Sequence, residues 1–473
     1  MIKIFTFVIL IKFFLSEIIK IPFGIINTEE DSESNPLIGK LFFNRLYINL
    51  TIGTPPKKIK VFLRKDSYAL YISEKNFNKS FSDSYKSNNI LETFFLDIYT
   101  TGYISKEIIR IGDYQNNNNT LLDFVLAVSD DNSLGALGLK IPHNFPEGMC
   151  SFIHSLKNNS IISSYTWTLK YYSNKKLIDS INDRNAPIGE LIIGGEPHEY
   201  EENKEKYPSN EYLFVEAPIH SYKHYWDLKI KSIYIISDSK IEMSNNNYKK
   251  DEVSLKAESS VIFGTKVYYD IIYSHFFKKY DYITNKICEE KNVPNKSNFN
   301  YIECSNNKEL FDIKKFPNIY FESYELNKTF ELTYEDLFVL DEETNKYIFL
   351  IVFPTNYAGT EWGLGIPFLR KYQFTFNEDK KVIGFYNDEV KTNVNNYDGK
   401  GNRIGLYFLI GFLFILFCGL LIILGMYIHK YFYGEKRKKK ANELDDDFTY
   451  ETNQNNNSDN KINNDKNERL MDE

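Results

Sequence analysis

A run of 25 residues without a charged side chain, Ile404–Ile428, constrains the topology of this chain more than any other feature. A helix that rises about 1.5 Å per residue over that length can cross a hydrocarbon core about 30 Å thick. The basic cluster Lys436–Lys440 follows the run, whereas few positive charges precede it, and basic residues favour the cytosolic side of a membrane. The run therefore predicts a transmembrane helix with a cytosolic C-terminus.

The N-terminus carries a second targeting signal. Residues 1–17 combine a short basic start with the apolar run Ile4–Leu15 and a small residue, which is typical of a cleaved signal peptide, although an uncleaved anchor has the same pattern. Both signals together predict a single-pass type I protein of the secretory pathway or cell surface, with its body luminal or extracellular. Residues 18–45 are interpreted as a leader or propeptide, 391–403 as a linker, and 429–473 as a disordered tail.

Composition favours sheet over helix in the body. The chain contains 36 tyrosines and 37 phenylalanines, and aromatic residues fit the half-buried surface of a pleated sheet. The formal net charge of -7, without a basic stripe in the body, argues against nucleic acid as a partner. The expected class is therefore all-β.

Four cysteines constrain the body further. Cys418 lies in the predicted span, which leaves Cys150, Cys288 and Cys304 in an oxidising compartment. Cys288 and Cys304 enclose a short loop, and a bridge that closes about 15 residues stabilises a fold by about 3 kcal/mol. We therefore expect a Cys288–Cys304 disulfide, with Cys150 either a buried free thiol or a partner in an intermolecular bridge.

The segment Leu46–Ile72 predicts a β-hairpin. Tyr47–Ile52 alternates apolar and polar residues, Gly53–Pro56 is a turn, and Ile59–Leu63 resumes the alternation. Further strands are expected from similar patterns, and a short helix from another segment. The strands are Leu91–Ile98, Gly102–Ile111, Leu121–Val128, Ser164–Tyr172, Gly189–Gly195 and Ile230–Ile236, and the helix is Phe152–Leu156.

The order of these segments resembles the pepsin-like aspartic protease family. Motifs that match the family occur in the family's order at Ile52–Pro56, Ser133–Leu139, Gly189–Gly195, Tyr225–Leu228, Phe316–Phe321, Trp362–Tyr372 and Val382–Phe385. The resemblance implies a bilobal all-β fold, with an N-terminal lobe over 46–195, a C-terminal lobe over 196–390 and a groove between them. The family's second-lobe disulfide also matches Cys288 and Cys304.

The same resemblance implies that both catalytic aspartates are missing. The first falls on Arg64, eight residues after Pro56, and matching Gly264–Thr265 to the family's second loop puts the second on Ile262. Arginine stays protonated and isoleucine cannot exchange a proton, so neither residue can replace a catalytic carboxylate. Asp66 is a weak alternative for the first acid.

The expected function is therefore that of a membrane-tethered, catalytically inactive binding or scaffold protein. Its groove could accept a polypeptide, and no cofactor or metal is expected. The alternatives are an active aspartic endopeptidase with an unrecognised acid such as Asp66, and a stability-only relic with a filled cleft. Groove residues are expected at Arg64, Asp66, Phe95, Ile262, Gly264 and Thr265, with Phe95 at the family's flap tyrosine. Glycosylation sequons begin at Asn49, Asn78, Asn118, Asn158, Asn295 and Asn327.

Overall fold

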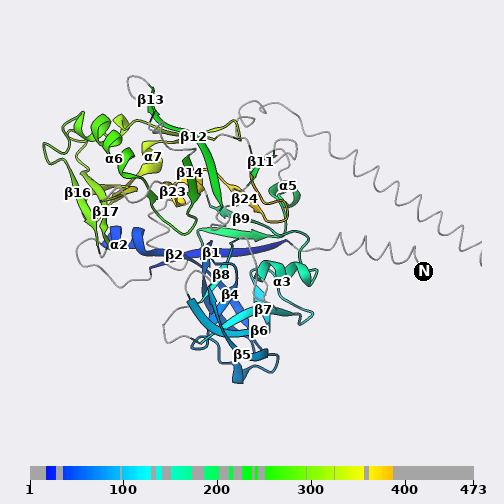
Figure 1. Cartoon of the computed structure of the whole chain (residues 1–473). Helices are drawn as coiled ribbons and strands as arrows, with labels where there is room; N and C mark the ends of the chain where they lie inside the picture. Colours follow the sequence, from blue (N-terminus) through cyan, green and yellow to red (C-terminus); the bar gives the residue numbers. More distant parts are fainter. Residues whose placement is uncertain are drawn as a thin grey trace, which may run out of the picture. The chain divides into compact units, whose positions relative to one another are not determined.

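The computed structural model describes most of the predicted body. The described residues are 18–27, 36–65, 67–95, 99–128, 135–140, 151–172, 186–201, 212–216, 226–236, 240–242, 251–294, 296–323, 325–355 and 362–386. Within them the chain is mostly strand, in two large sheets, which confirms the all-β class (Figure 1). The predicted signal peptide, Asp66, Cys150, the linker, the predicted span and the tail lie outside these residues.

The first sheet contains thirteen strands in the described part of the chain and draws on both halves of the sequence. In spatial order the strands are β11 (Tyr212–Glu216), β25 (Val382–Tyr386), β24 (Phe374–Asn377), β9 (Thr166–Tyr171), β10 (Gly189–Ile193), β1 (Ile19–Asn27), β2 (Asn44–Ile52), β3 (Lys57–Arg64), β8 (Ala136–Gly138), β4 (Leu70–Ser73), β7 (Leu121–Ala127), β6 (Tyr99–Ile111) and β5 (Lys86–Phe95).

The second sheet contains twelve described strands, all from the C-terminal half. Ten of them follow one path: β19 (Thr329–Leu332), β18 (Ile319–Ser323), β12 (Asp227–Ile236), β14 (Asp251–Leu255), β23 (Trp362–Leu364), β15 (Ile262–Phe263), β22 (Ile351–Pro354), β17 (Lys296–Ser305), β21 (Lys346–Phe349) and β20 (Phe338–Asp341). Off this path, β13 (Lys240–Glu242) pairs with β12, and β16 (Cys288–Val293) pairs with β17.

Helices in the described residues are short. They are α2 (Pro36–Phe43), η1 (Lys79–Phe81), α3 (Phe152–Asn158), α5 (Pro197–Tyr200), α6 (Lys266–Ile272), η3 (Tyr273–Lys278), η4 (Ile313–Lys315), α7 (Tyr334–Leu337) and α8 (Ile366–Lys371). α3 confirms the predicted helix and begins after Ser151, whose Oγ accepts a hydrogen bond from the His154 backbone N–H at 3.1 Å. None of the helices that the structure describes is long and apolar enough to span a membrane.

The predicted opening hairpin is confirmed as β2 and β3. The two strands pair from Tyr47↔Phe62 to Ile52↔Lys57, with the turn at Gly53–Pro56. Leu46, Ile48, Leu50 and Ile52 are all buried, so the alternation in the sequence does mark the face of β2 that enters the core.

Residues 19–27 of the predicted leader or propeptide are part of the first sheet. They form β1, which pairs with β10 on one side and β2 on the other, in the middle of the first sheet. The alternate residues Ile19, Ile21, Phe23 and Ile25 are buried, and they supply the apolar face that holds the strand in place.

The hairpin of β5 and β6 corrects the bounds of a predicted strand. Tyr99–Thr101, which lie between the predicted strands Leu91–Ile98 and Gly102–Ile111, belong to β6, and the ladder runs through Thr93↔Thr101 to Phe95↔Tyr99. The hydroxyls of Thr93 and Thr101 are 3.1 Å apart across the two strands. Tyrosine and threonine favour strands, which explains why this segment continues the ladder.

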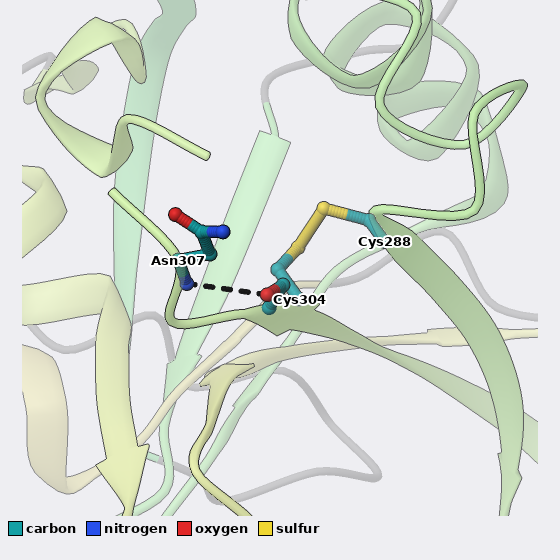
Figure 2. Close-up of a disulfide and its surroundings, with 4 residues drawn as sticks. Cys288, Cys304 and Asn307 are labelled. Atoms are coloured by element: carbon teal, nitrogen blue, oxygen red, sulfur yellow. Dashed lines mark hydrogen bonds between the residues drawn. A yellow bond between two sulfur atoms is a disulfide. The ribbon is translucent and has the colours of Figure 1, made fainter. Parts of the chain in front are cut away.

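The predicted disulfide is confirmed. Cys288 opens β16 and Cys304 lies near the end of β17, where the two residues face each other in the antiparallel ladder (Figure 2). Both cysteines are buried, so the bridge is part of the core of the second sheet.

Candidate functional site at the two central loops

In the first sheet, one loop joins two strands that are not neighbours, because a third strand crosses between them. β3 ends at Arg64, and the chain returns through a loop as β4. β8 lies between them, parallel to β3 and antiparallel to β4. Because β8 comes from farther along the chain, the loop at the end of β3 is enclosed by strands from two segments. We call residues 64–69 the first central loop.

The second sheet repeats this crossing. β14 ends at Leu255, and the chain returns as β15, with β23 between them. β23 is parallel to β14 and antiparallel to β15. Residues 256–261 form the second central loop. The repeat of a parallel and an antiparallel neighbour around each loop gives the two halves of the chain an internal symmetry.

Two glycines fix which residues of the loops match. A Cβ on Gly138 would lie 2.4 Å from the Ser67 carbonyl oxygen, and one on Gly365 would lie 2.5 Å from that of Ser259. Each glycine therefore lets the backbone pass close behind the third residue after the start of a loop. The match of Ser67 with Ser259 makes Lys256 the counterpart of Arg64.

The strand registers give the same match. Leu63 pairs with Leu137 just before Gly138, and Leu255 pairs with Leu364 just before Gly365. The residue that follows each of these leucines is Arg64 in one loop and Lys256 in the other.

Ile262 is therefore not the counterpart of Arg64, and this expectation is wrong. Ile262 lies in β15 and is completely buried, paired with Ile351 in β22. Its position matches Leu70, the first residue of β4. Gly264 and Thr265 follow β15 and are also buried, so they too lie outside the second central loop. Burial in the core explains the positions of all three residues better than a groove does.

The two loops have related sequences. The first reads Arg64–Ser67 (RKDS) and the second Lys256–Ser259 (KAES). Each has a cation first, a carboxylate two residues later and then a serine. The six-residue spacing from Arg64 to Leu70 and from Lys256 to Ile262 is a signal that sequence reasoning missed.

Three hydrogen bonds join the surroundings of these loops. Lys65 Nζ donates to Ser254 Oγ at 3.0 Å, and both residues are buried. Trp226 Nε1 donates to the Leu139 carbonyl at 3.0 Å. These contacts link residues of the first sheet to residues around β14 in the second. The two central loops are therefore held against each other by side chains from both sheets.

The third bond involves a tyrosine of β9. Tyr171 donates its hydroxyl proton to the Ala257 carbonyl at 3.0 Å. Burial raises the pKa of Tyr171, the negative charge of Glu258 raises it further, and Arg370 lowers it. The phenol thus stays protonated and remains a donor to the second central loop.

The structure describes two of the other three predicted groove residues, Arg64 and Phe95. Arg64 is partly exposed, so the start of the first central loop reaches solvent. Phe95 ends β5 and pairs with Tyr99. Asp66 lies outside the described residues. Among the residues that are described, no group of three or more His, Cys, Asp and Glu could hold a metal ion.

No protein-family model and no curated protein matches this chain. The resemblance to pepsin-like proteases rests on the sequence motifs, and the symmetric crossing around each central loop is a separate observation.

Proposed function

We propose that this chain is a membrane-tethered, pepsin-like protein without peptidase activity, which binds an extended polypeptide between two lobes. The observation that carries the proposal is the pair of cations at matching positions, Arg64 and Lys256. The family that the sequence resembles uses two carboxylates that share one proton, one as base and one as acid. Neither an arginine nor a protonated lysine can accept a proton from water.

Binding does not require the catalytic acids. An extended peptide adds to exposed strand edges through its backbone N–H and C=O groups, and alternate side chains enter pockets. β5 forms one edge of the first sheet, and Ile90 and Leu91 on it are exposed. Its hairpin with β6 is the part of the chain that resembles the family's flap. These features support a groove that holds a peptide without cutting it.

The membrane anchor and the orientation belong to the same proposal. The uncharged run Ile404–Ile428 and the basic residues after it support a type I topology with the two sheets in a lumen or outside the cell. The disulfide between Cys288 and Cys304 supports an oxidising compartment. Of the sequon asparagines that the structure describes, Asn49, Asn78, Asn118, Asn158 and Asn327 are exposed.

Calorimetry with a statine-type inhibitor tests the proposal. The hydroxyl of such an inhibitor mimics the tetrahedral intermediate and needs the two carboxylates, so we expect no measurable binding to the full chain. Tight binding that Arg64→Ala and Lys256→Ala both leave unchanged would contradict the placement of cations at the centre.

A second candidate function is supported by one observation. Glu258 stands in the second central loop where Asp66 stands in the first, so each loop does carry one carboxylate, two residues after its cation. An aspartic endopeptidase could use these two acids if both loops were displaced by two residues. Hydrolysis that is lost in both Asp66→Asn and Glu258→Gln would favour this candidate.

A further inference from the structure

The turn between β24 and β25, residues 378–381, carries a buried acid that faces a histidine of α3. Only 3 % of the Glu378 side chain is exposed, and its Oε2 accepts no hydrogen bond from the part of the chain that the structure describes. His154 Nε2 lies 3.3 Å from this oxygen, which is close enough for an ion pair. The His154 side chain is 20 % exposed, so its imidazole can exchange protons with solvent.

Other contacts hold the two residues at this distance. The Glu378 backbone N–H donates to the Tyr165 carbonyl at 3.0 Å, and the imidazole of His154 packs on the Tyr165 ring with the ring centres 4.1 Å apart. Farther along α3, Lys157 pairs with Asp379, which also accepts the Tyr165 backbone N–H at 2.7 Å. α3 and the turn therefore meet at two acid–base pairs, one partly exposed and one buried.

On β7, which also contacts α3, the nearest charged side chain already has its own partners. Asp123 accepts a hydrogen bond from Ser155 Oγ of α3 at 2.7 Å and pairs with Lys106 at 3.0 Å. This contact fixes α3 on the first sheet. The helix is thus held at one side by Asp123 and at the other by the turn.

A second histidine–glutamate contact near the same turn has additional donors. His198 Nε2 is 3.6 Å from Glu196 Oε2, but the Glu196 carboxylate also accepts hydrogen bonds from Asn377 Nδ2 at 2.9 Å and Lys380 Nζ at 3.1 Å. These donors compensate the charge of Glu196 whatever the charge of the imidazole. Among the described residues, the buried oxygen of Glu378 has no such donor, so its charge depends on His154.

An ionised carboxylate that is buried without donors costs stability. Burial raises the pKa of Glu378, His154 lowers it by less, and the negative charge of Asp379 raises it again. One proton held by the pair removes the cost, because it either neutralises the carboxyl group or makes the imidazole a cation that pairs with the carboxylate. Imidazole groups ordinarily take up such a proton between about pH 8 and about pH 5.

We propose that His154 and Glu378 form a pH-sensitive latch between α3 and the β24–β25 turn. The pair takes up one proton as the pH falls from about 7.5 to about 5.5, and the protonated pair holds the helix on the turn more tightly. Because folding raises the pKa of Glu378, this stabilisation is present in acid and is lost as the pH rises. The latch requires no bound peptide, so it is independent of the proposed function.

Hydrogen exchange of the full chain in detergent tests the latch at α3. Mass spectrometry measures exchange at about pH 7.5 and about pH 5.5, and conversion to protection factors removes the intrinsic pH dependence of exchange. One proton strengthens the closed latch at most tenfold per pH unit, so we expect the α3 protection factors to rise by about 10- to 100-fold in acid. Glu378→Gln and His154→Gln should each abolish the rise, whereas the control His275→Gln, at a histidine of η3, should retain it.

A double-mutant cycle distinguishes the latch from a merely structural contact. At about pH 5.5, His154→Gln should raise the unfolding equilibrium constant about tenfold when Glu378 is present, and should have little effect in Glu378→Gln. Near pH 7.5 this coupling should disappear. Glu378→Gln alone should be at least as stable as the wild type near pH 7.5, because the amide brings no charge into the core.

Three outcomes would overturn the latch. The first is a rise in α3 protection that survives in either Glu378→Gln or His154→Gln. The second is a coupling of equal size at both pH values. The third is wild-type protection that does not change between them, and this measurement needs no variant, so the latch can be rejected even if a substitution prevents folding.

Discussion

At the scale of single residues, a buried lysine links the two sheets at the centre of the molecule. Lys65 follows Arg64 directly, and its ammonium group reaches Ser254, which is 189 positions away in the chain. A lysine is rarely buried unless its charge is compensated. Lys65 therefore contributes to holding the loops together, whereas Arg64 and Lys256, at the start of each loop, retain access to solvent.

Ser254→Ala tests this link. The substitution removes the acceptor of a hydrogen bond from a charged group, so we expect the free energy of unfolding to fall by about 1.5–3 kcal/mol. Thermal unfolding of the full chain in mild detergent measures the loss. Ser80→Ala, at an exposed serine, is the control and should cost little. Equal stability of the two variants would show that the link does not stabilise the fold.

A single residue, Glu303, should make the stability of the fold depend on pH. Burial alone would raise the pKa of this carboxyl, but hydrogen bonds and charge from Lys291 and Lys346 hold it below the ordinary 4.5. Because the pKa is lower in the folded state, ionised Glu303 stabilises the fold above about pH 4.5, and this contribution is lost as the pH falls below that value. The stability advantage of the wild type over Glu303→Gln should shrink over that range in acid unfolding curves. An advantage that does not change with pH would contradict this.

At the scale of elements, the two glycines behind the central loops should be equally sensitive. A Cβ on Gly138 would lie 2.4 Å from the Ser67 carbonyl oxygen, and one on Gly365 would lie 2.2 Å from that of Val261. Gly138→Ala and Gly365→Ala should each cost about 3 kcal/mol, since backbone must move in both cases. In Gly195→Ala the nearest atoms belong to the flexible side chains of Glu199 and Ile18, so this control should cost much less. Chemical unfolding curves in which Gly138→Ala and Gly365→Ala cost very different amounts would argue against the internal symmetry, and a Gly195→Ala loss equal to both would argue against the close backbone contacts of these two glycines.

The disulfide between β16 and β17 should also stabilise the fold. Cys288→Ser together with Cys304→Ser should lower the free energy of unfolding by about 3 kcal/mol, because the open loop gains conformational entropy in the unfolded chain. Peptide mapping without reductant checks the pairing directly. A free thiol at either position would refute it.

The sequence predicts many of the strands, but it does not predict β1. The hairpin of β2 and β3 is visible because its alternation and its Gly-Thr-Pro-Pro turn agree. β1 has the same alternation, but Pro22 stands in its middle, and proline is usually confined to edge strands. Pro22 is exposed and lies opposite Glu190 in the ladder with β10. Only the paired sheet shows that this proline is tolerated between two neighbours.

The sequence predicts where the first central loop begins but places the second loop too far along the chain. Arg64 follows from a fixed distance after the Pro55–Pro56 turn, which anchors the count. No turn at a fixed distance marks the start of the second loop. Gly264–Thr265 resembles part of the family's second catalytic motif, but this match lies six residues after the position that the strand pairing gives. Pairing between β14 and β23, which are far apart in the chain, is what identifies Lys256. Contacts of that range cannot be found from local pattern alone.

At the scale of the whole molecule, the proposed function rests on the chemistry of one centre. Two sheets contribute one loop each to a common centre, and each loop begins with a cation where the family that the sequence resembles has a catalytic acid. In the proposed function such a centre binds a peptide, and two cations cannot divide a proton as two carboxylates do.

Hydrolysis of a mixed peptide library by the full chain in detergent, from about pH 3 to about pH 7, tests this claim most directly, because two acids that share a proton would be active within that range. The account predicts no cleavage products by mass spectrometry at any pH, and no change in Asp66→Asn. Cleavage by the wild type that is abolished in Asp66→Asn would contradict it.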